Sequence, residues 1–76
     1  MNNTRRKKVK QLLTELKTVS NALCDLQNQE AEAIKKTPKN LMHTEKVTQM
    51  KDDEMNLGFA VSDLESVFDD LSVIIQ

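Results

Sequence analysis

Apolar residues recur at alternating steps of three and four along the first half of the chain, at Val9, Leu12, Leu16, Val19, Leu23 and Leu26. This spacing is the heptad pattern of an amphipathic helix with one apolar stripe. Asn2, Asn3 and Thr4 are residue types that cap helix N-termini. Pro38 lacks an amide donor and disfavours helical backbone at the residue before it. The sequence therefore predicts a first helix over about residues 4–36.

The same spacing continues in the second half of the chain, at Val47, Met50, Glu54, Leu57, Val61, Leu64, Phe68, Leu71 and Ile75. Thr44 is a suitable N-cap for this helix, and Glu45 places a carboxylate in the first turn, where the helix dipole favours negative charge. The pattern predicts a second helix over about residues 44–75, after a loop over about residues 37–43.

The two apolar stripes match each other in an antiparallel arrangement. Facing residues of such a pair have residue numbers with a constant sum, and a sum of 80 joins Val9 with Leu71, Leu12 with Phe68, Leu16 with Leu64, Val19 with Val61, and Leu23 with Leu57. The implied midpoint is Asn40, two residues after the only proline, where turn chemistry independently places the loop. We therefore expect an all-α fold, an antiparallel two-helix hairpin that forms a single domain over residues 1–76.

The second helix is apolar over more than one stripe. The surplus apolar residues are Phe59, Ala60, Val67, Val73 and Ile74 in the second helix and Leu13 in the first. An apolar surface this wide is typical of a helical bundle, and a 76-residue chain buries little surface on its own. We expect two hairpins to form a homodimeric antiparallel four-helix bundle through these residues. The alternative is that the same face receives a helix of another protein.

Charged side chains are unevenly distributed, although the net charge of the chain is only −1. Residues 1–20 carry six cations and one acid, whereas residues 52–76 carry seven acids and no cation. Cations at a helix N-terminus face the positive pole of the helix dipole, which costs about 0.3–1 kcal/mol each. Antiparallel pairing lays the basic segment beside the acidic one, so we expect the two segments to act as mutual counterions.

The basic segment allows two other interpretations. One is contact with the phosphates of a nucleic acid through Arg5, Arg6, Lys7, Lys8 and Lys10. This segment has no interleaved aromatic residues for base stacking, and the acidic half of the chain would repel a polyanion. The other interpretation is docking to an acidic protein.

Candidate catalytic and metal-binding side chains are few and scattered. Glu30 and Glu54 occupy apolar-stripe positions, where a polar residue usually fixes the register of the helices. Residues 52–54 read DDE, but three consecutive helical side chains point about 100° apart and cannot converge on one metal ion. The lone Cys24 and the lone His43 do not face each other in the predicted register. We therefore expect a non-enzymatic protein with no catalytic site, no metal site and no cofactor.

Segments that would direct the chain to a membrane or out of the cell are not visible. The basic N-terminus is not followed by an apolar signal core, and no apolar run approaches the ~20 residues that span a bilayer. The single cysteine cannot form a disulfide within the chain, which fits a reducing compartment. We expect a cytoplasmic protein of a bacterial host that does not contact membranes.

The chain resembles a group of small helical proteins encoded by phages, prophages and other mobile elements of Gram-positive bacteria. The resemblance lies in the opening MNNTRRKK, in EAEAI at 30–34, PKNL at 38–41 and TEK at 44–46, in Met50 and Leu57, and in the final LESVFDDL. The chain departs from this group at Lys35 and Lys36, where an acid and an amide would be expected. The resemblance implies a helical hairpin of mobile-element origin and no established reaction. We expect a protein–protein interaction module that binds and modulates a host or phage protein.

Overall fold

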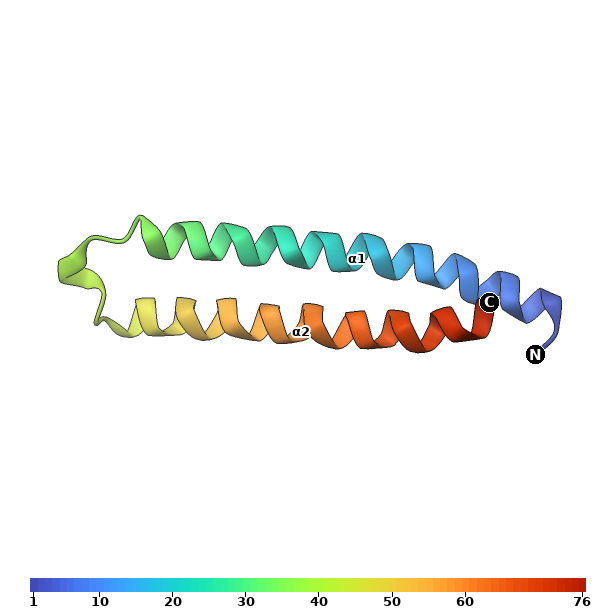
Figure 1. The fold of residues 1–76 in the computed structure, drawn as a ribbon. Coiled ribbons are helices and arrows are strands. Elements are labelled where there is room, and N and C mark those ends of the chain that lie inside the picture. The colour runs from blue at the N-terminus through green and yellow to red at the C-terminus, as the bar shows by residue number, and fades with distance from the viewer.

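The computed structural model describes residues 1–76 and contains two long helices joined by a short loop (Figure 1). Helix α1 spans Asn3–Lys35, the 3-10 turn η1 spans Lys39–Leu41, and helix α2 spans Glu45–Ile75. The chain contains no strand, so the prediction of an all-α protein with two long helices is confirmed. The helix bounds differ from the expected ones by at most one residue at each end.

Side-chain caps define where the two helices begin. The Asn2 side chain accepts a hydrogen bond from the backbone N–H of Arg5 at 2.8 Å. The Thr44 hydroxyl accepts one from the backbone N–H of Val47 at 3.4 Å. These bonds satisfy amides that the first helical turn leaves without partners. Both N-caps were among the residues that the sequence predicted, and Pro38, with φ −60° and ψ 147°, holds the backbone extended after α1.

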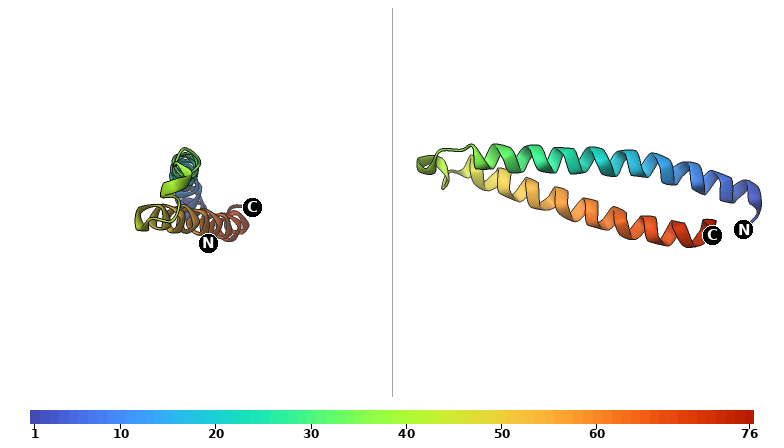
Figure 2. Two further views of the ribbon diagram at one scale, coloured as in Figure 1. Left: turned by 90° about the vertical axis from the view of Figure 1, so that its left-hand side faces the viewer. Right: turned by 45° about the horizontal axis from the view of Figure 1, so that its top comes forward.

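Helices α1 and α2 lie side by side and run in opposite directions (Figures 1 and 2). Near the termini, the Arg6 guanidinium donates a hydrogen bond to the backbone carbonyl of Ile74. Near the middle, the Gln27 amide donates one to the Glu54 carboxylate at 3.2 Å. The residue numbers of these two pairs sum to 80 and 81, close to the register that the apolar stripes predict. The result is a rod of 59 × 15 × 14 Å.

The face of α1 that contacts α2 differs from the predicted stripe. The positions of low exposure along α1 at heptad spacing are Val9, Leu13, Leu16, Ser20, Leu23, Gln27, Glu30 and Ile34. Leu12, Val19 and Leu26 are 44%, 50% and 50% exposed. The prediction that these three residues face α2 is therefore wrong, as is the prediction that Leu13 lies outside the contact. On the surface of α1, the row of Leu12, Val19 and Leu26 lies on one side of Val9, Leu16 and Leu23, and the row that begins with Leu13 lies on the other side. Either row completes a heptad pattern, so heptad spacing alone does not tell which row contacts α2.

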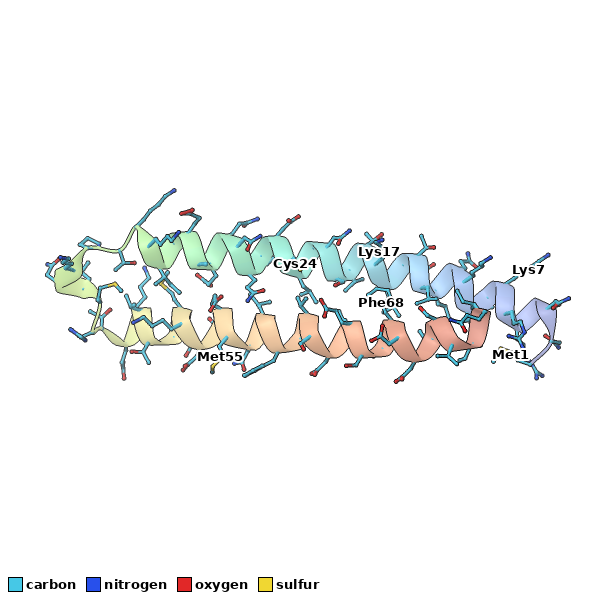
Figure 3. The ribbon with its side chains drawn as sticks, in the orientation of Figure 1. Met1, Lys7, Lys17, Cys24, Met55 and Phe68 are labelled. Atoms are coloured by element: carbon cyan, nitrogen blue, oxygen red, sulfur yellow. The ribbon has the colours of Figure 1, made fainter.

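On α2 the contact face follows the predicted stripe. All nine stripe positions from Val47 to Ile75 are buried or partly buried. Figure 3 shows Phe68 between the two helices, whereas Met55 lies on the side of α2 away from α1. The packing is nevertheless thin, because Val47, at 3% exposure, is the only buried apolar residue. A radius of gyration of 17.4 Å, against about 11 Å for a compact domain of this length, describes a rod without a closed core.

The Arg6 contact explains why a cation is tolerated near the N-terminus of α1. α2 has no basic residue in its last turn, so its C-terminal carbonyls lack a cation from their own helix. In the antiparallel arrangement Arg6 reaches these carbonyls from α1 and donates to Ile74. A cation is unfavourable beside the positive pole of α1 but favourable beside the negative pole of α2. The sequence analysis expected the basic segment to pair with carboxylates. Arg6 instead caps the C-terminal end of the neighbouring helix.

Replacing Arg6 with Met keeps most of the aliphatic stem and removes the donor to Ile74. We expect this variant to lower the free energy of unfolding by roughly 1 kcal/mol, the usual value of one such hydrogen bond. Urea unfolding followed by circular dichroism at one fixed protein concentration measures the change. Lys7→Met is the matched control, because Lys7 is exposed and has no hydrogen-bond partner across the helix pair. Equal stability of the two variants would contradict the capping role.

Candidate functional site

Two groups of apolar residues lie outside the contact stripe of the helix pair. The side face consists of Leu12, Val19 and Leu26 on α1 and Ala60, Val67 and Ile74 on α2. The outer ridge consists of Phe59 and Val73 on α2. The side face lies next to the contact stripe of each helix, and the outer ridge lies on the side of α2 opposite that stripe.

Helix geometry places the six side-face residues on one side of the rod. Each of them precedes by one residue a contact position at heptad spacing; for example, Val19 precedes Ser20 and Val67 precedes Phe68. Two antiparallel helices are related by a two-fold axis perpendicular to the plane that contains both helix axes. Rotation about this axis exchanges the helices but leaves a residue on the same side of that plane. Residues at equivalent heptad positions of α1 and α2 therefore lie on the same flank. The three α1 residues and the three α2 residues form one continuous surface.

The two flanks of the rod differ strongly in chemistry. On the side face, Leu12, Val19 and Leu26 are about half exposed, Val67 is 39% exposed, and Ala60 and Ile74 are partly buried. The opposite flank carries the residues that follow the contact stripe, namely Lys10, Lys17, Cys24, Ala31, Lys51, Gly58, Glu65 and Ser72. The side-face flank is thus mainly apolar, with Arg5, Lys46 and Asp53 as its charged members, and the opposite flank is mainly charged or small. This sidedness marks the side face as the flank suited to contact another protein surface.

The outer ridge points away from α1. Phe59 is 58% exposed and Val73 is 70% exposed. They are separated by two heptads, or about 21 Å along the helix, so they form two separate apolar points instead of a patch. Ser66 lies midway between them and is exposed. Such an arrangement suits two anchoring contacts with a second molecule better than self-packing of a core.

The expected partner-face residues are therefore divided among three environments. Ala60, Val67 and Ile74 lie on the side face, whereas Phe59 and Val73 form the outer ridge. Leu13, the sixth expected residue, contacts α2. Sequence reasoning missed the α1 half of the side face, because it assigned Leu12, Val19 and Leu26 to the stripe that contacts α2. The adjacent pair of leucines at positions 12 and 13 was the available signal that α1 has two apolar rows.

The basic segment lies beside the C-terminal end of α2 (Figure 1). Arg5, Lys7, Lys8 and Lys10 are exposed, whereas Arg6 is partly buried through its bond to Ile74. Asn3, Arg6, Lys7, Lys10 and Ile75 line a shallow hollow between the two chain ends. The exposed carboxylates at positions 69 and 70 lie at the same end of the rod. This end therefore presents both signs of charge rather than a uniformly basic surface.

The titratable side chains do not gather into a reactive cluster. No three of the His, Cys, Asp and Glu side chains lie together in a way that could hold a metal ion. Cys24 is a partly buried free thiol on α1, and His43 is exposed in the loop. Asp53 accepts a hydrogen bond from Gln49 at 2.9 Å along the same helix. The acidic run at 52–54 is thus divided between local and cross-helix bonds.

Gln27, Glu54 and Gly58 form a polar layer across the middle of the helix pair. The Gln27 amide nitrogen donates to the Glu54 carboxylate, and both side chains are partly buried. A Cβ atom on residue 58 would lie 2.7 Å from that same amide nitrogen. Glycine within a helix costs about 1 kcal/mol relative to alanine, but here it makes room for the amide. The seam position of Glu54 is therefore explained by a cross-helix hydrogen bond.

We expect Gly58→Ala to change stability little in the wild-type chain, because the gain in helix propensity is offset by loss of the Gln27–Glu54 hydrogen bond when the added Cβ displaces the amide. In a Gln27→Ala background the obstruction is gone, and Gly58→Ala should stabilise the protein by about 1 kcal/mol. A double-mutant cycle by urea unfolding measures this difference. Ser66→Ala, at an exposed position of the same helix, controls for propensity alone. Additive effects of the two substitutions would show that residues 27 and 58 do not interact.

No protein-family model, no curated protein and no solved structure matches this chain. Neither helix contains a stretch long and apolar enough to cross a membrane.

Proposed function

We propose that this protein is a non-enzymatic protein–protein interaction module that dimerises into an antiparallel four-helix bundle. In this proposal each copy contributes one helical hairpin, and the side face is the surface through which the copies meet. The outer ridge stays exposed and binds a host or phage protein. The resemblance to small mobile-element proteins supports the role of an accessory factor that acts inside a bacterial host.

The observation that carries the proposal is the amount of surface that a single chain exposes. The accessible surface is 5997 Å², whereas a compact monomer of 8.7 kDa would expose about 4,700 Å². The excess of roughly 1,300 Å² exceeds the ~800 Å² that each partner buries in a standard protein interface. A second copy on the side face would cover apolar atoms that the first copy leaves in water.

The arrangement of apolar rows on α1 also supports a bundle. A helix that contacts a single neighbour needs one apolar stripe, whereas a bundle helix contacts two neighbours and needs a wider one. On α1 the row of Leu13 and Ile34 faces α2, and the row of Leu12, Val19 and Leu26 is left for a second neighbour. Val9, Leu16 and Leu23 lie between the two rows. α1 is therefore built as a bundle helix.

Two valines on the side face test the dimer. We expect Val19→Lys and Val67→Lys each to weaken dimerisation by roughly 100-fold, because each change removes two buried valines from a symmetric dimer at ~1.5 kcal/mol apiece. Val73→Lys is the matched control, since Val73 is 70% exposed on the outer ridge and should leave the dimer intact. Light scattering behind a sizing column measures the molar mass over a dilution series. A wild-type monomer, or equal weakening by all three variants, would contradict the side-face dimer.

The outer ridge is tested by affinity capture from bacterial lysate. We expect the wild-type protein to retain a discrete partner that the Phe59→Ser, Val73→Ser double variant does not retain. Leu41→Ser is the matched control, because Leu41 is 44% exposed in η1, outside the helix that carries the ridge. Both variants should remain dimers by light scattering, so that a lost band reports lost docking. Identical captured proteins from all three baits would rule out the ridge as the docking surface.

A further inference from the structure

We infer that the second copy packs with its loop at the same end of the bundle, so that α1 of each copy lies against α2 of the other. This inference rests on the proposed dimer and adds the orientation of the two copies. It follows from the symmetry of a two-chain interface and from the distribution of charge along the rod.

Symmetry leaves two arrangements for a dimer formed through the side face. In an isologous dimer the same surface of both copies meets across a two-fold axis that lies in the contact plane. If the axis runs along the rod, both loops lie at the same end and α1 contacts α2 of the second copy. If the axis crosses the rod, the loops lie at opposite ends, and α1 contacts α1 while α2 contacts α2. In both arrangements neighbouring helices are antiparallel.

The apolar residues can be satisfied in either arrangement. With the axis along the rod, Leu12 meets Val67 of the second copy and Val19 meets Ala60 of the second copy. With the axis across the rod, Leu12 meets Val19 of the second copy and Ala60 meets Val67. Each arrangement covers these four side-face residues, so burial of apolar surface does not choose between them.

Charge does distinguish between the two arrangements. Residues 52–76 of α2 carry seven acids and no cation, and residues 1–20 carry six cations and one acid. With the axis across the rod, the acidic half of α2 lies against the acidic half of the second α2, and Asp63 and Glu15 each approach their own copies near the axis. With the axis along the rod, the acidic half of α2 lies against the basic start of the second α1. Complementary potentials select orientation, and like-charge contacts reject the alternative.

Individual pairs illustrate the difference. Lys8 and Asp70 are both exposed and both stand one step outside the side face on their helices. With both loops at one end, Lys8 approaches Asp70 of the second copy. In the opposite arrangement Lys8 approaches Ala22 and Asp70 approaches Asn56 of the second copy, and neither finds an opposite charge. The same-end arrangement also brings Glu15 of each copy to Asp63 of the other, which makes two like-charge contacts, as many as in the opposite arrangement. The pairs of Lys8 with Asp70 therefore distinguish the two arrangements.

A distance between the two loops tests this orientation. The probe is a nitroxide spin label on Asn40→Cys in a Cys24→Ser background, which leaves one labelled cysteine per copy. Asn40 is exposed in the loop, and the rod is 59 Å long. With both loops at one end, the label-to-label distance should be less than about half the rod length, because neighbouring helix axes lie about 8–10 Å apart. With loops at opposite ends it should be at least about the full rod length.

A label on Glu15→Cys in the same background is the control. This position lies near the middle of the bundle in both arrangements and should give a short distance in either, which verifies that labelled dimers are present. A short loop-to-loop distance supports the inference. A long loop-to-loop distance together with a short control distance overturns the orientation and leaves the dimer standing. A monomer by light scattering overturns the dimer itself, and with it the inference.

Discussion

The presence of two polar side chains in the contact between α1 and α2 determines much of this structure. Ser20 is the most buried residue of α1, and Gln27 faces Glu54, although apolar residues stand one position earlier on the same helix. Rotating α1 by roughly 50° would bury Leu12, Val19 and Leu26 against α2 and expose the polar pair. The observed rotation instead presents the apolar row to the side of the rod. A single neighbouring helix can contact only one of the two apolar rows of α1, so the other row stays exposed.

A polar layer in a thin interface has a cost and a use. A partly buried amide and carboxylate contribute less to stability than leucines of similar volume would. They do specify register, since sliding one helix by a single residue would separate the Gln27 donor from the Glu54 acceptor. Gly58 supports the same register, because its missing side chain accommodates the amide. The middle of the pair is therefore arranged for alignment more than for burial.

The sequence was sufficient to predict the two helices, their caps and the pairing register, because these depend on local chemistry and on spacing. Asn2, Thr44 and Pro38 act through their own backbone neighbours, and the constant sum of paired residue numbers follows from antiparallel geometry. The rotation of α1 could not be predicted in the same way. The rows that contain Leu12 and Leu13 both satisfy the heptad, and preference for apolar contact favours the wrong one. The basic segment was expected to act as counterion to the acidic one because side-chain charges are visible in a sequence, whereas the free carbonyls at the end of α2, to which Arg6 donates, are not.

The thinness of the helix pair has a consequence for how this chain folds. Ordering a residue costs about 1–2 kcal/mol of backbone entropy, and burial of apolar surface has to offset that cost. In the isolated pair Val47 is the only buried apolar residue, and the radius of gyration is that of a rod. If the side face is covered by a second copy, much of the apolar burial that stabilises the helices arises only on association. Folding and dimerisation then become one equilibrium, in which stability depends on protein concentration. In such a dimer the position of the apolar row on α1, outside the pair, would couple folding to association.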